Sequence, residues 1–157
     1  MNIPNLELAR SLLLDETPLS CDCGTLCGCA CCQGDDQTGM LLFPGEESLY
    51  KDCTFGRILT THGTIGRQKA LVFVCRGTCP RDQRPLSCRL FPLFLRFKNG
   101  KPRVRLDPRA HMCPLRGYGL PGLKQSFVSR AEEVYSLLMQ DEDCADFLRG
   151  LDAACSL

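Results

Sequence analysis

Six of the twelve residues in the segment Cys21–Cys32, which reads CDCGTLCGCACC, are cysteines. Almost nothing in this segment can build a hydrophobic core, so it needs another source of order. Bound metal, an iron–sulfur cluster or disulfides are the candidates. The chain has 13 cysteines in 157 residues, close to the content of disulfide- or metal-stabilised scaffolds. Thiolates favour zinc and iron–sulfur chemistry over magnesium or calcium, so we expect a thiolate metal centre.

A structural zinc ion takes four ligands in a tetrahedron, and these ligands usually come from two groups that the fold brings together. The first group here is the Cys21–Cys32 segment. The second follows a predicted strand and has the spacing Cys75-x3-Cys79-x8-Cys88. The predicted metal ligands are Cys21, Cys23, Cys27, Cys31, Cys32, Cys75, Cys79, Cys88 and Cys113, with Cys53, His62 and His111 in reserve.

The cysteine spacing leaves the number of metal ions open. The chain has one Cys-x-x-Cys, from Cys29 to Cys32, and lacks the paired knuckles of an ordinary zinc ribbon. Adjacent Cys31 and Cys32 are expected to point to different places. Either the two thiols bind two different metal ions, or one of them is a metal ligand while the other packs against the protein. Cys144 and Cys155 lie in predicted helical sequence and are expected to be buried small hydrophobes or free thiols.

Charge and the N-terminal sequence limit the possible locations and partners. Nineteen basic and eighteen acidic side chains leave a net charge of +1, which argues against nucleic acid or an anionic membrane as partner. Charged residues interrupt the apolar run at 12–14, and no stretch reaches the length of a membrane span. We therefore expect a cytoplasmic protein with reduced thiols and an unknown protein or small-molecule partner. A lipoprotein signal before Cys21 and a secreted, disulfide-stapled domain are the alternatives.

The elements that must position these thiols follow from hydrophobic periodicity and turn residues. A helix is predicted over 4–16, strands at 40–43, 55–62 and 69–75, and a hairpin over 93–107 around Asn99-Gly100. A turn is predicted at 34–36, a single helical turn near 46–47, and two helices after Leu123. We expect one α+β domain over 1–157. It has a small, mostly antiparallel sheet, helices at both ends of the chain, and a loop-built, cysteine-rich metal centre.

Two strings further along the chain carry a family resemblance. Cys31-Cys32 followed by GMLLFPGEE, and then RPLSCRLFP, is similar to the cysteine-rich zinc- or iron-chelating family of bacteria. That family is named for a CxxCxxCC signature and includes the flagellin lysine N-methylase branch. The resemblance covers about 21–113, and its most specific part is the segment 84–92. Upstream of Cys31, Thr25 and Gly28 stand where the signature has cysteines. The resemblance implies metal ligands at Cys31, Cys32, Cys79 and Cys88.

Two functions are consistent with these patterns. The first is a zinc-binding protein whose metal is largely structural. The alternative is an iron–sulfur protein with redox activity or methylase-like enzymatic activity, the latter resting on the resemblance alone because no glycine-rich nucleotide-binding turn is found. Whether the chain is an enzyme stays open. Arg84 and Arg89 are expected either to donate hydrogen bonds to thiolates or to pair with surface carboxylates.

Overall fold

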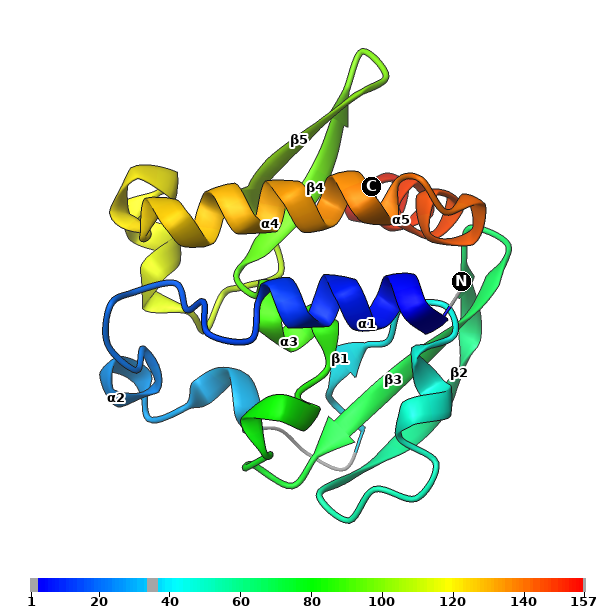
Figure 1. The fold of residues 1–157 in the computed structure, drawn as a ribbon, viewed down its shortest axis with the longest axis horizontal. Coiled ribbons are helices and arrows are strands. Elements are labelled where there is room, and N and C mark those ends of the chain that lie inside the picture. The colour runs from blue at the N-terminus through cyan, green and yellow to red at the C-terminus, as the bar shows by residue number, and fades with distance from the viewer. Residues whose placement is uncertain (1–2, 34–36, 157) are drawn as a thin grey trace.

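The structure is a computed structural model that describes residues 3–33 and 37–156. The turn predicted at 34–36 lies outside the described residues. Helix α1 (Ile3–Leu12) lies alongside α4 (Gln125–Leu138), and α5 (Glu142–Cys155) follows α4 near the end of the chain (Figure 1). These are the helices predicted at both ends of the chain, although α1 ends four residues earlier than expected. The carboxylate of Asp141 caps α5 by accepting a hydrogen bond from the Cys144 N–H, at 3.0 Å.

The strands form two small antiparallel sheets, where the sequence predicted one. Strands β1 (Met40–Leu41), β2 (Gly56–Ile65) and β3 (Gln68–Cys75) make a sheet in the order β1-β3-β2. Strands β4 (Leu93–Lys98) and β5 (Lys101–Leu106) make a separate hairpin. The hairpin turn is Asn99-Gly100, as predicted, and both residues have a positive φ. That backbone is the two-residue turn that matches the twist of antiparallel strands.

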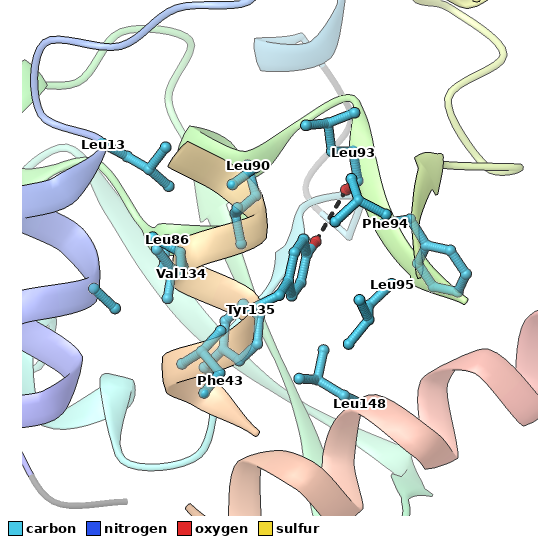
Figure 2. Packing of buried hydrophobic residues seen from close by; sticks show 14 of the residues in the cluster. Leu13, Phe43, Leu86, Leu90, Leu93, Phe94, Leu95, Val134, Tyr135 and Leu148 are labelled. Carbon is cyan, nitrogen blue, oxygen red and sulfur yellow. Dashed lines mark hydrogen bonds between the residues drawn. The ribbon is translucent and has the colours of Figure 1, made fainter. Parts of the chain in front are cut away.

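One hydrophobic cluster joins the helices to the hairpin, as Figure 2 shows. Helix α4 buries a stripe of apolar side chains, Phe127, Ala131, Val134 and Leu138, and α1 packs against it through Leu6 and Ala9, which are also inaccessible. A second cluster lies under the three-stranded sheet, where the rings of Tyr50 and Phe73 pack 4.8 Å apart. The largest buried side chains of the main cluster include Leu6, Leu13, Leu86, Leu90, Phe127, Val134, Leu138 and Phe147.

Short helices and 3₁₀ turns carry four of the cysteines, namely Cys27, Cys31, Cys32 and Cys88. The cysteine-rich segment contains α2 (Gly24–Cys27) and a 3₁₀ turn at Ala30–Cys32. Helix α3 (Leu86–Leu90) lies in the RPLSCRLFP string. Further 3₁₀ turns occur at Glu46–Leu49, Arg81–Gln83, Pro114–Tyr118 and Leu120–Gly122. The turn at 46–49 was predicted, whereas α2 and α3 were not.

The α+β class is therefore confirmed. The longest helices, α4 and α5, have 14 residues each, fewer than a bilayer-spanning helix requires. Within the described part of the chain, no helix has the length and apolarity to cross a membrane.

Candidate metal centre

Local hydrogen bonds shape the cysteine-rich segment. The Asp22 carboxylate accepts from the Gly24 N–H at 3.0 Å, and the Asp22 carbonyl accepts from the Thr25 hydroxyl at 2.8 Å. Gly28 ends α2 with a φ of 62°, a left-handed conformation that glycine adopts at little cost. None of the residues of α2 or of the following 3₁₀ turn is buried. The segment therefore has backbone order without hydrophobic anchoring.

The second cysteine group follows β3. Cys75 is the last residue of that strand, and its thiol donates to the Thr78 carbonyl at 3.7 Å. Cys79 lies in the next loop, where its sulfur accepts a hydrogen bond from Arg84 Nε at 3.4 Å. This contact supports the expectation that Arg84 donates to a thiolate.

Arg89 has a different role from either one predicted for it. Its guanidinium donates to the backbone carbonyls of Arg84 and Asp82 at 2.8 Å each, and to those of Arg10 at 2.9 Å and Arg81 at 3.1 Å. It therefore contacts neither a thiol nor a surface carboxylate in these bonds. Because four carbonyls converge on one cation, Arg89 fixes the backbone that carries the Arg84 side chain.

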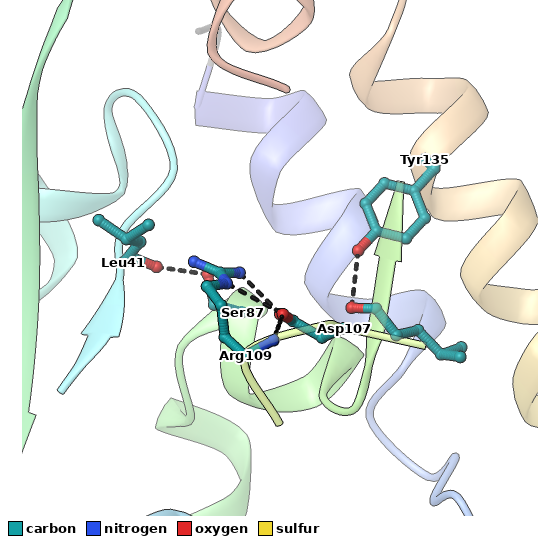
Figure 3. A network of polar contacts seen from close by, with 6 residues as sticks. Leu41, Ser87, Asp107, Arg109 and Tyr135 are labelled. Carbon is teal, nitrogen blue, oxygen red and sulfur yellow. Dashed lines mark hydrogen bonds and ion pairs between the residues drawn. The ribbon is translucent and has the colours of Figure 1, made fainter. Parts of the chain in front are cut away.

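Glu46 positions α3 and its cysteine, Cys88. The Glu46 carboxylate is fully buried and accepts from the N–H of Leu86 at 2.7 Å and from that of Phe43 at 3.0 Å. The Ser87 hydroxyl also donates to the carbonyl of Leu41 (Figure 3), which ties α3 to strand β1. This arrangement was not predicted, because a glutamate in a turn is ordinarily solvated.

Two adjoining cavities bring the cysteine groups together. The first, of about 210 Å³, is lined by Arg84, by Phe91 and by seven cysteines: Cys23, Cys27, Cys29, Cys31, Cys32, Cys79 and Cys113. The second shares Cys23, Cys31, Cys32 and Arg84 with it and adds Cys21 and Cys88. Eight of the nine predicted ligands thus line one cavity or the other. The ninth, Cys75, lies close enough to Cys79 and Cys32 for their charges to raise its pKa, although burial is the larger cause.

The thiols of Cys31 and Cys32 are adjacent and affect each other's ionisation. Their interaction raises the pKa of Cys31 and lowers that of Cys32. Arg84 lowers the pKa of Cys32 further, against the opposing effects of burial and of Asp22. Cys32 is therefore the thiol of the pair that ionises first.

Burial and neighbouring charges raise the pKa of two other thiols that line the cavities, Cys23 and Cys88. Burial raises the pKa of Cys23 most, followed by the charges of Cys113, Asp22 and Cys27. Burial also raises the pKa of Cys88, and the charges of Glu46, Cys32 and Cys79 add to this effect, while Arg84 opposes it. Packed thiols with few counter-charges resist ionisation, and a bound cation reverses that tendency.

The remaining candidates lie elsewhere. Cys53 donates to the Gly56 carbonyl at 3.4 Å and packs on the second hydrophobic cluster. His62 is exposed on β2, and the Nδ1 of His111 lies 3.3 Å from a guanidinium nitrogen of Arg116. Cys144 is completely buried in the main cluster, and Cys155 packs against it, as predicted.

The thiols have the chemistry of a metal site but not its geometry as the chain stands. All 13 cysteines lie within the described residues, and none of them forms a disulfide there. Over 3–33 and 37–156, no three His, Cys, Asp or Glu side chains converge tightly enough to hold a metal ion. Cys29 lines the first cavity although it was not among the predicted ligands; its spacing to Cys32 was the available signal. Coordination would require rotation of thiols about χ1, the one side-chain torsion that places a cysteine sulfur.

Comparison with known proteins does not assign the chain to a family. No protein-family model matches the chain, and neither the curated proteins nor the solved structures yield a match. The resemblance to the CxxCxxCC family stays a prediction from the sequence motifs.

Proposed function

We propose that this chain binds zinc through clustered thiolates in a largely structural site, and that it does so in the cytoplasm, where its thiols stay reduced. The observation that carries the proposal is the gathering of thiols from four separate segments around two adjoining cavities. These segments are the cysteine-rich stretch, the loop after β3, helix α3 and the loop at Cys113. A protein or small molecule would be its partner.

The lack of hydrophobic anchoring supports a structural role for the metal. Helix α2 and the 3₁₀ turn at Ala30–Cys32 bury no side chain, so little burial free energy holds them in place. A zinc ion bound by thiolates from this segment and from the later loops would cross-link the two. Such binding free energy is also folding free energy, because the unfolded chain has no preformed site.

The surroundings of the thiols also fit a thiolate-bound cation. Arg84 donates to Cys79 and lowers the pKa of Cys32, so one positive charge already faces the cavities. Four thiolates around a divalent ion leave an excess of negative charge, which a donating guanidinium offsets.

Metal analysis of the whole chain tests the proposal. The protein would be purified without oxygen, stripped, loaded with Zn²⁺ and passed through a gel-filtration column before elemental analysis. We expect retained zinc, a colourless protein and a rise in melting temperature on loading. Cys144→Ala, which removes a thiol remote from both cavities, should retain as much zinc as the unaltered chain.

Two results would count against zinc. Failure of the unaltered chain to retain any zinc would overturn the proposal. A brown protein that contains iron and acid-labile sulfide after anaerobic purification would support the iron–sulfur alternative, with redox or methylase-like activity, instead.

A further inference from the structure

We propose that the chain also binds a small, uncharged and largely apolar molecule that carries one hydroxyl group, such as a phenol or a short alcohol. The binding site is a pocket of about 250 Å³ between β1, α3, the β4–β5 hairpin, α5 and the loop that follows β5. We call it the core pocket. No cysteine is among the described residues that line it, so this binding does not depend on metal.

Side chains of the main hydrophobic cluster form most of the wall of the core pocket. Each of them is at most 8% exposed, so water inside the pocket finds few hydrogen-bonding partners there. An apolar molecule that displaces such water gains free energy of binding. These wall residues include Leu90, Phe94, Leu95, Phe147, Leu148 and Leu151.

The volume of the core pocket limits the size of its ligand. A cavity of ~150 Å³ is large enough to hold benzene, whereas drug-sized ligands occupy pockets of roughly 300–1,000 Å³. The core pocket, with about 250 Å³, lies between these values. Its ligand is therefore expected to have a single ring or a short aliphatic chain.

Two solvent-exposed side chains of the loop after β5 give access to the core pocket. Met112 is 48% exposed, and the side chain of Arg109 is 45% exposed, although both residues line the pocket. A small molecule can therefore enter at this loop without opening the hydrophobic cluster.

An ion pair between Asp107 and Arg109 forms a polar end of the core pocket (Figure 3). Arg109 Nε donates to Asp107 Oδ1 at 2.9 Å, and Nη2 donates to Oδ2 at 2.7 Å. The backbone N–H of Arg109 also donates to Oδ1, at 2.8 Å, which fixes the carboxylate further. Because the pair has no net charge, a charged ligand would enter an apolar pocket without a compensating charge, at a high cost in desolvation.

The ion pair leaves one donor and one acceptor for a ligand. Arg109 Nη1 has no hydrogen-bond partner among the described residues. Asp107 Oδ2 accepts one bond within the described part of the chain, and a carboxylate oxygen has room for two. A hydroxyl group both donates and accepts, so it can bond to either residue. A carboxylate or an ammonium group would face one member of the pair with its own sign of charge.

Methionine methyl signals test the proposal in the unaltered, reduced chain, with phenol as the probe. Met40 and Met112 line the core pocket, whereas Met139 lines a different groove, beside β5 and α4. The methyl groups would be labelled with carbon-13 and followed by NMR during a titration. We expect the Met40 and Met112 signals to shift and reach saturation at millimolar phenol, while the Met139 signal stays in place. No shift at Met40 and Met112, or an equal shift at Met139, would overturn the proposal.

Three further probes of similar ring size test the chemistry of the ligand. Benzene has no hydroxyl group and should bind roughly two- to tenfold more weakly than phenol, the value of one hydrogen bond. Benzoate and benzylammonium should bind at least about tenfold more weakly, because each adds a net charge to an apolar pocket. Benzene that binds as tightly as phenol would contradict the role of the hydroxyl group. A charged probe that binds as tightly would contradict the uncharged class.

A substitution in the wall tests the location of the probe. Leu151→Phe adds volume within the core pocket and should weaken phenol binding. Leu137→Phe is the matched control, because Leu137 packs against the main cluster and is not among the residues that line the pocket. Circular dichroism shows whether both variants fold, and the titration of the unaltered chain does not depend on them. Equal phenol affinities of the two folded variants would place the probe outside the core pocket.

Discussion

The Nε of Arg84 donates a hydrogen bond to the sulfur of Cys79 over 3.4 Å. Arg84 also interacts with the charges of Cys32 and Cys88, so one guanidinium serves three thiols. Its own backbone is held by Arg89, whose Nε donates to the Arg84 carbonyl at 2.8 Å. A positive charge is therefore fixed beside Cys79, Cys32 and Cys88 before any cation arrives.

Arg84→Gln should weaken zinc binding by roughly ten- to a hundredfold, the usual cost of losing an outer hydrogen-bond partner of a metal ligand. Glutamine removes the charge that offsets the excess of thiolates. Arg84→Lys should recover part of the loss, since it keeps the charge but not the planar donor. Competition with a chromophoric zinc chelator measures the affinity. Arg103→Gln, on the exposed face of β5, is the matched control, and equal affinities for the two Gln variants would contradict the assigned role.

Glu46 should make stability depend on pH. Burial raises the pKa of Glu46 to about 7 from its ordinary 4.5, although the N–H groups of Leu86 and Phe43 and the charges of Arg10 and Arg89 oppose the shift. Between these two values the folded chain binds more protons than the unfolded chain. The Glu46 contribution to the unfolding free energy is therefore complete below about pH 4.5 and is lost as the pH rises towards 7, by up to about 1.4 kcal/mol per pH unit.

Urea unfolding of metal-free, reduced protein, followed by circular dichroism, tests this dependence against Glu46→Gln. The amide loses one of the two acceptors for buried N–H groups, at a cost of about 1–3 kcal/mol. The stability advantage of the unaltered chain over this variant should shrink as the pH rises through the window. An advantage that grows with pH would show that the carboxylate is more stable charged than neutral at this position.

Local sequence signals predicted the elements that depend on local physics. Asn99-Gly100 specifies its hairpin because both residues accept a positive φ. Asp141 and Asp143 are both typical N-cap residues near the start of α5, and Asp141 is the one that caps it, because its carboxylate satisfies an N–H of the first turn. The stripe on α4 was likewise visible in the spacing of Phe127 and Val134.

The parts of the fold and of the candidate site that were not predicted depend on contacts between residues far apart in the sequence. Helix α3 has only five residues, and its first N–H, that of Leu86, donates to Glu46, 40 residues earlier in the chain. The sequence shows how many cysteines there are, but not which of them lie close together in the fold. Their grouping depends on β3, which brings Cys75 near Cys32, and strand pairing between distant segments leaves little trace in one sequence.

Tyr135→Phe should destabilise the fold by about 1–2 kcal/mol, because the buried hydroxyl donates to the Leu93 carbonyl at 3.2 Å (Figure 2). The loss should appear in urea unfolding with no change in zinc content, since this contact belongs to the core and not to the cavities. Tyr118→Phe is the matched control, because the Tyr118 side chain is 74% exposed. Equal stability of the two variants would mean that the buried hydroxyl bond contributes nothing.

Cys144→Ala should cost about 1 kcal/mol of stability through lost packing, because Cys144 is completely buried in the main cluster. Zinc content should not change. Burial raises the pKa of this thiol to about 12, so it is protonated at neutral pH. Elemental analysis beside urea unfolding separates the two effects, and a loss of zinc in this variant would place a metal ligand in the core.

Cys88→Ser should loosen the cysteine-rich segment although Cys88 lies more than fifty residues beyond it. Removing the Cys88 thiolate weakens the zinc-mediated link between α3 and the cysteine-rich segment. Limited proteolysis of the zinc-loaded chain should show faster cleavage within 21–33. The increase should be smaller than that of chelator-treated unaltered protein, because the remaining thiolates still bind zinc. Cys53→Ser removes a half-buried thiol outside both cavities. This variant should be cleaved at the same rate as the unaltered chain. If Cys88→Ser does the same, the cysteine-rich segment is ordered without help from the RPLSCRLFP loop, and the two cysteine groups do not share a metal.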